Sequence, residues 1–187
     1  MRLAAAAGVP VPAVHSALGP EIRMELVPGP TMLSHLFDHP HRAEAYGREL
    51  AALHRRLDHV QPAEGSELRL VHGDLHPGNV VLSSRGPVLL DWTNYRFGNR
   101  ALDLALTWLI LACFEPIEAT PRTPFTRLRG PLLEGFLGAV DRSAASASLD
   151  DAANIRYADP ATTPDEQERI GRMCEEHHPT IQPPNNP

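Results

Sequence analysis

The sequence contains no lysine. All 17 of its basic residues are arginine, and with 23 acidic residues the net charge is −6. A Walker A loop is therefore excluded, because it needs a lysine for the phosphates, and so is a Schiff-base enzyme, which needs a lysine amine. The acidic balance also argues against a nucleic-acid partner, since proteins that bind nucleic acids usually have a basic face.

Cysteines and long apolar runs are scarce too. Cys113 and Cys174 form no Cys-x-x-Cys pair, so neither a cysteine metal site nor a redox pair is predicted. Reduced thiols favour a cytoplasmic location. The longest apolar run, residues 104–114, is far shorter than the ~20 residues that span a bilayer. It predicts a buried helix and no membrane partner.

Proline, in contrast, is abundant: 19 of the 187 residues, against a usual share of about 5%. This predicts long loops and short elements. The remaining composition, 42% apolar and 21% charged, is ordinary for one soluble globular domain.

Periodicity and turn residues predict a mainly helical domain with a few small strand pairs in its first half. Tyr46, Leu50, Leu53 and Leu57 recur at steps of four, three and four, which is typical of a half-buried helix, here expected over residues 41–59. Further helices are expected at residues 3–7, 31–38, 101–114, 128–147 and from 163 onward. Strands are expected at residues 11–15, 22–27, 69–71, 80–82 and 88–90.

Polar side chains gather in the segment VHGDLHPGNVVLSSRGPVLLD, residues 71–91. The strands at 80–82 and 88–90 should pair through the intervening turn, which brings Asn79 close to Asp91. Two oxygen ligands in this position suit Mg²⁺, which takes a few protein oxygens and keeps the rest of its shell for water and phosphate. Asp74, on the loop before Asn79, is free to face a substrate hydroxyl.

This segment resembles a kinase catalytic loop, in which an Asp is the base and an Asn is a metal ligand. With Gly73 in place of the kinase Arg, the form HGDLHPGN is similar to the aminoglycoside phosphotransferase and choline kinase family, and Asp91-Trp92 stands where protein kinases have Asp-Phe-Gly. The resemblance implies an α+β, protein-kinase-like fold with a mainly helical large lobe. It also implies ATP and Mg²⁺ as cofactors and a small-molecule hydroxyl as the phosphoryl acceptor.

The resemblance assigns roles residue by residue. The catalytic residues are Asp74 as the base and His76 near the transferred phosphate; the Mg²⁺ ligands are Asn79 and Asp91; the adenine-binding hinge is Glu25, Leu26 and Val27; the structural residues are His72 and Asp103, with Asp103 anchoring the loop. Each residue also has a simpler interpretation. Asp74 could cap the loop, Asn79 could close a turn, and His76 could lie exposed at the surface.

A kinase of this family begins with a small lobe that carries a phosphate-covering loop and a strand Lys, and this sequence has neither a Lys nor a Gly-x-Gly. We therefore expect an N-terminally truncated chain. Residues 1–30 would be the end of the small lobe and the hinge, 31–176 the large lobe, and 177–187 a disordered tail. An uncovered apolar edge near Ile22–Val27 would then favour self-association.

Two other functions remain open at this point. Gly73-Asp74-Leu75-His76 imitates a metallophosphoesterase motif, although that chemistry needs two metals and several more ligands. The second alternative is a catalytically inactive, kinase-like remnant that serves as a binding module, which the missing Lys favours.

Overall fold

The computed structural model describes residues 1–115 and 125–177. The predicted disordered tail therefore lies outside the described residues from 178 onward. The α-helices are α1 (Arg2–Ala6), α2 (Met32–Asp38), α3 (Ala43–Leu57), α4 (Arg100–Cys113), α5 (Phe125–Leu137), α6 (Arg142–Ser146), α7 (Leu149–Ala158) and α8 (Pro164–His177), with short 3₁₀ turns η1 (Pro40–Arg42) and η2 (Pro77–Asn79). The strands are β1 (Val14–Leu18), β2 (Glu21–Met24), β3 (Arg69–Val71), β4 (Val80–Ser83), β5 (Gly86–Leu89) and β6 (Arg96–Gly98). The predicted α+β class is confirmed.

The described strands form three separate antiparallel pairs, β1–β2, β3–β6 and β4–β5. The β4–β5 hairpin forms as predicted, with Val80 opposite Leu89 and Ser83 opposite Gly86, although β5 covers Gly86–Leu89 and not the expected residues 88–90. Strand β6 was not predicted, because its three residues, Arg-Phe-Gly, show no alternation of apolar and polar side chains. It pairs with β3, so that Leu70 lies opposite Phe97.

The first hairpin is shifted relative to the prediction. Strands were expected at residues 11–15 and 22–27, but β1 begins at Val14 and β2 ends at Met24. The shift follows from Pro10 and Pro12, because proline has no N–H to donate to a partner strand.

The helix expected over residues 128–147 is divided in two. Helix α5 ends at Leu137, and α6 begins only after Asp141, whose carboxylate accepts a hydrogen bond from the N–H of Ala144. An Asp that caps a new helix in this way fixes a helix start. Helix α7 was not predicted, since its apolar residues follow no clear helical stripe.

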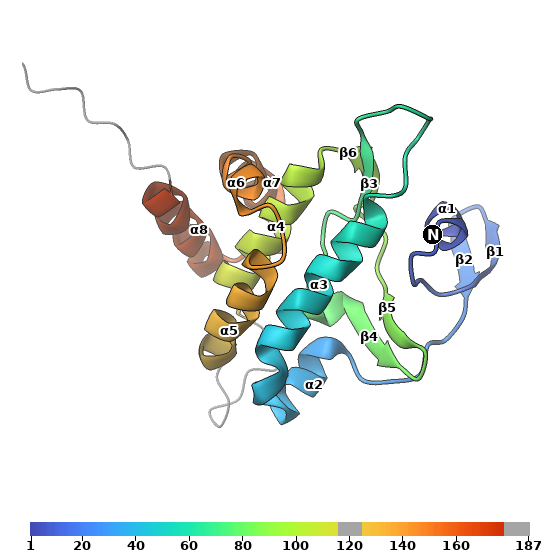
Figure 1. Cartoon of the computed structure of the whole chain (residues 1–187), viewed down its shortest axis with the longest axis horizontal. Helices are drawn as coiled ribbons and strands as arrows, with labels where there is room; N and C mark the ends of the chain where they lie inside the picture. The colour runs from blue at the N-terminus through green and yellow to red at the C-terminus, as the bar shows by residue number, and fades with distance from the viewer. Residues whose placement is uncertain (116–124, 178–187) are drawn as a thin grey trace, which may run out of the picture.

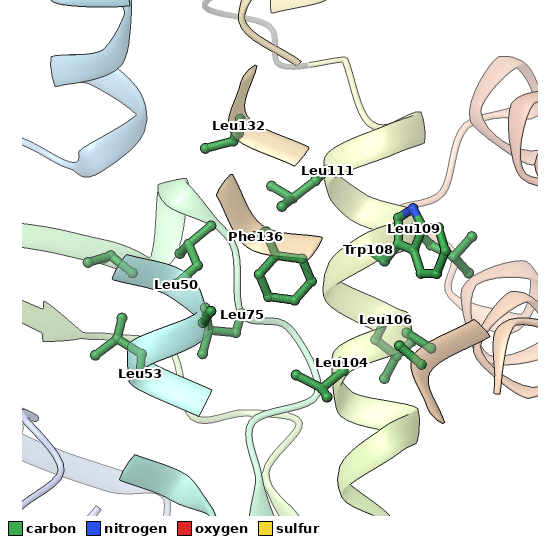
Figure 2. Close-up of a cluster of buried hydrophobic side chains, with 14 of the residues drawn as sticks. Leu50, Leu53, Leu75, Leu104, Leu106, Trp108, Leu109, Leu111, Leu132 and Phe136 are labelled. Carbon is green, nitrogen blue, oxygen red and sulfur yellow. The ribbon is translucent and has the colours of Figure 1, made fainter. Parts of the chain in front are cut away.

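The core lies where α3, α4 and α5 meet (Figure 1). Every residue of the predicted α3 stripe is buried, and Leu50 and Leu53 lie in one cluster with Leu75 and Phe136 (Figure 2). The crossing of α3 and α5 is close: a Cβ on Gly47 would overlap the backbone of α5, and one on Gly135 would overlap the backbone of α3. Only glycine permits this approach.

Helix α1 and the β1–β2 hairpin lie at one end of the molecule, far from α8 (Figure 1). The hairpin exposes large apolar side chains, with Ile22 56% and Met24 49% exposed, and Leu26 beyond it is 92% exposed. The self-association expected through this segment stays a prediction. Within the described residues, no helix is both long and apolar enough to cross a membrane.

Candidate functional site

The catalytic-loop motif lies between β3 and β4, and a hydrogen-bond network within the loop orients Asp74. The side-chain amide of Asn79 donates to the Asp74 backbone oxygen at 2.9 Å and to the Asp74 carboxylate oxygen Oδ2 at 3.1 Å. The Asp74 side chain keeps 25% of its surface exposed. Within the described residues its other oxygen, Oδ1, accepts no hydrogen bond, so it is available to a substrate hydroxyl.

Asp103 of α4 holds the start of the loop. Its two carboxylate oxygens accept the backbone N–H groups of His72 (3.0 Å) and Gly73 (2.8 Å). Burial alone would raise the pKa of Asp103, but hydrogen bonds from His54, Gly73 and His72 outweigh burial and lower the pKa. An ionised carboxylate therefore fixes the two residues that precede Asp74.

His72 is fully buried, and its side chain links the catalytic loop to the residues that follow β5. Its Nε2 lies 2.9 Å from the carbonyl oxygen of Leu90, and its ring meets the indole of Trp92 edge-on, with 5.1 Å between centroids. Because a carbonyl oxygen only accepts, Nε2 carries the ring proton. The remaining nitrogen, Nδ1, is buried and has no partner among the described residues.

We expect His72 to make the protein less stable as the pH decreases. Burial lowers the pKa of His72, so the folded chain holds the ring neutral, whereas the unfolded chain takes up a proton near its ordinary pKa of about 6.5. The contribution is therefore complete above about pH 6.5 and is lost as the pH drops below it. Urea unfolding at pH 7.5 and 5.5 should show a smaller pH dependence in His72→Gln than in wild type.

The exposed His15 supplies the control for this measurement. His15→Gln should retain the wild-type pH dependence. Equal dependences in wild type and His72→Gln would show that the buried ring does not contribute.

His76 lies beside Asp74. Its Nδ1 accepts the N–H of Gly78 at 3.1 Å, which caps η2, so the ring proton sits on Nε2, 3.8 Å from Asp74 Oδ2. Burial lowers the pKa of His76, against the attraction of Asp74. The side chain is 20% exposed, so the alternative of a fully exposed surface histidine does not hold, and a neutral N–H donor lies next to the predicted base.

The β4–β5 hairpin connects the two predicted metal ligands. Asn79 immediately precedes β4, Asp91 follows β5, and the N–H of Leu90 donates to the Asn79 carbonyl at 2.8 Å. Asp91 has φ +52°, a left-handed conformation that few non-glycine residues adopt. Its Oδ1 accepts the N–H and hydroxyl of Thr93 at 3.3 and 2.7 Å.

The free oxygens of this pair fit Mg²⁺. Among the described residues, neither the Asn79 amide oxygen nor Asp91 Oδ2 accepts a hydrogen bond. A hard cation that keeps several waters needs only one or two such protein oxygens. No cluster of three or more His, Cys, Asp or Glu that could hold a metal occurs in the described part of the chain, so the ligand set that a metallophosphoesterase requires is not found there.

The predicted hinge, Glu25 to Val27, lies directly after β2. Glu25 accepts the N–H of Ala13 at 3.0 Å and pairs with Arg85 of the β4–β5 turn at 2.8 Å, and Arg85 lowers the pKa of Glu25. The hinge is thereby tied to the hairpin that carries Asn79 and Asp91. In the described residues no hydrogen bond uses the backbone groups of Leu26 or Val27, so they are free to bind a base.

The structure thus brings Asp74, His76 and Asn79 into one loop, with Asp91 at the adjoining strand end. The hinge is joined to the β4–β5 hairpin through the Glu25–Arg85 pair. Sequence reasoning missed Thr93, which holds Asp91, and also His54 and Thr107, which are buried polar residues in α3 and α4. The sequence contains a signal for His54 and Thr107. His54 lies four residues after Leu50 and three before Leu57, beside the apolar stripe of α3, and Thr107 lies within the apolar run of α4.

Comparison with known proteins agrees with this site. A sequence model of the phosphotransferase enzyme family matches residues 55–144, a segment that includes the catalytic loop, Asp91 and Asp103. No match was found among curated proteins. Residues 55–144 are therefore similar to the phosphotransferase enzyme family, and the resemblance to aminoglycoside phosphotransferases and choline kinases is confirmed.

Proposed function

We propose that this protein transfers the γ-phosphoryl group of ATP to a hydroxyl of a small molecule. The observation that carries the proposal is the loop geometry: Asp74 is held by Asn79 through one carboxylate oxygen and keeps the other free. Family membership of residues 55–144 supports the reaction class.

The residues of the site have two kinds of role: some orient the acceptor hydroxyl, and others offset the charge of the phosphates. Asp74 accepts the hydrogen bond of the acceptor hydroxyl and takes its proton as the phosphoryl group is transferred. Asn79 and Asp91 would hold Mg²⁺, which would offset the negative charge of the phosphates. His76 would donate its Nε2–H toward the transferred group.

Two cavities support this arrangement, one beside Asp91 and one beside Gly73. The first, of about 390 Å³, has apolar walls that include Val14, Ile22, Met24 and Leu90, and Asp91 lies in its lining. An apolar space beside a metal ligand suits a nucleotide base, and Met24 directly precedes the predicted hinge. We place the nucleotide there.

The second cavity, also about 390 Å³, is lined by Gly73, Arg96, Ile155 and Arg156, among others. Gly73 precedes the predicted base, and three of the other lining residues, Ile155, Arg156 and Ala158, come from α7, which fits the expectation that helices after residue 100 form the substrate wall. We place the acceptor there.

Asp91→Ala should abolish Mg²⁺-dependent nucleotide binding. The physical reason is that the phosphates lose the cation that offsets their charge. Isothermal titration with ATP, in the presence and absence of Mg²⁺, measures the effect. Asp150→Ala removes an exposed carboxylate on α7 and should leave binding unchanged.

Unchanged Mg²⁺ dependence in Asp91→Ala would remove this residue from the site. The binding-module alternative, which the absence of lysine favours, is distinguished by turnover. A module binds nucleotide without forming ADP, whereas a phosphotransferase releases ADP when a suitable hydroxyl compound is supplied.

A further inference from the structure

A second, fully buried polar network lies beneath the catalytic loop. His54 of α3 is 3% exposed, and Thr107 of α4 is 0% exposed. The Nε2 of His54 lies 2.9 Å from the Thr107 hydroxyl oxygen, and its Nδ1 lies 3.3 Å from Asp103 Oδ2. The Thr107 hydroxyl in turn lies 2.9 Å from the backbone oxygen of Leu75.

The network reaches the chain on both sides of Asp74. Asp103 binds the N–H groups of His72 and Gly73, which precede Asp74, and Thr107 binds the carbonyl of Leu75, which follows it. His54 is the residue that contacts both Asp103 and Thr107. The position of the predicted base is therefore coupled to one histidine.

Thr107 decides where one ring proton lies. The Leu75 carbonyl can only accept, so the single hydroxyl proton of Thr107 is committed to it. The Thr107 oxygen must then accept a hydrogen bond from the ring, because it has no second proton to give. Nε2 of His54 therefore carries a hydrogen.

The other ring nitrogen of His54, Nδ1, lies 3.3 Å from Asp103 Oδ2. The ring therefore lies between the carboxylate that binds the start of the loop and the hydroxyl that binds Leu75.

We propose that His54 is a positioning residue, held between Asp103 and Thr107, that fixes both segments flanking Asp74. Its catalytic meaning rests on the proposed function, but its effect on the loop structure does not. Among the described residues, the other elements around the ring supply no competing partner. Phe136 of α5 presents an apolar ring 5.8 Å away, and Asp58, which follows α3, pairs with Arg100.

The positioning role is tested at Thr107, where the loss of one hydroxyl leaves the His54 ring in place. Thr107→Val should speed the hydrogen exchange of the His72 and Gly73 amides, which Asp103 binds, and lower kcat by about 10²-fold, as expected for a displaced catalytic group, with KM for ATP unchanged. Thr107→Ser keeps the hydroxyl and should restore both. Leu109→Ala, a buried α4 residue outside the network, is the control for loss of stability alone.

Each combination of outcomes has a meaning. Equal kcat in the Val and Ser variants, or a loss equal to that of Leu109→Ala at matched stability, overturns the positioning role. The expected exchange pattern, but no ADP formation with any acceptor, supports this inference and counts against the proposed function instead.

Discussion

Asp74→Asn is expected to lower kcat by about 10²–10⁴-fold, the usual contribution of a general base. Asn keeps the shape of the side chain and one acceptor oxygen but removes the charge that takes the hydroxyl proton. KM for ATP should change little, because Asp74 contacts Asn79 and His76 and does not line the cavity in which we place the nucleotide. ADP release with a hydroxyl acceptor found by screening is the measurement.

A loss in Asp74→Asn that is confined to ATP affinity would contradict the assignment of Asp74 as base, because that pattern indicates lost ground-state binding. Near-normal kcat would contradict it as well. His76→Gln is a useful companion, since it removes the neighbouring N–H donor but leaves the carboxylate in place.

Asp103→Ala is expected to destabilise the fold by about 3–5 kcal/mol, because each buried donor left without an acceptor costs about 1–3 kcal/mol. The carboxylate is 3% exposed, and its loss leaves the N–H groups of His72 and Gly73 and the Nδ1 of His54 without their acceptor. Urea unfolding of wild type and variant gives the difference.

Glu168 provides the control for Asp103. It pairs with Arg172 at 2.8 Å on α8, where both side chains are more than half exposed, and such surface pairs contribute about 0–1 kcal/mol. Glu168→Ala should therefore unfold almost as wild type does. Similar losses of unfolding free energy in the two variants would mean that the buried contacts of Asp103 stabilise the fold no more than a surface ion pair does.

Much of the fold could be predicted because its signals are local. The signals for the stripe on α3, the short helix α2 and the β4–β5 turn each lie within a few residues, so the sequence predicted these elements near their true bounds. Strand β6 and helix α7 depend on distant partners. β6 is stabilised by β3, some 25 residues earlier, and α7 packs on α4, so neither could be predicted from local sequence.

The site shows the same division. Asp74, Asn79 and Asp91 lie in one motif whose spacing marks the chemistry. His54 and Thr107 come from two helices separated by 53 positions, and only the fold shows that they meet. The left-handed backbone of Asp91 was equally hidden, because Asp adopts that conformation at few positions and no neighbouring glycine signals it.

The close crossing of α3 and α5 has a consequence for synthesis on the ribosome. The apolar stripe of α3 ends at Leu57, but its partner is complete only at Leu137, so about 80 further residues must be made before the stripe can be covered. At roughly 5–20 residues per second, this takes about 4–16 s. During that interval the nascent chain presents Leu50, Leu53 and Leu57 to its surroundings, so a chaperone could bind this stripe while the chain is being made.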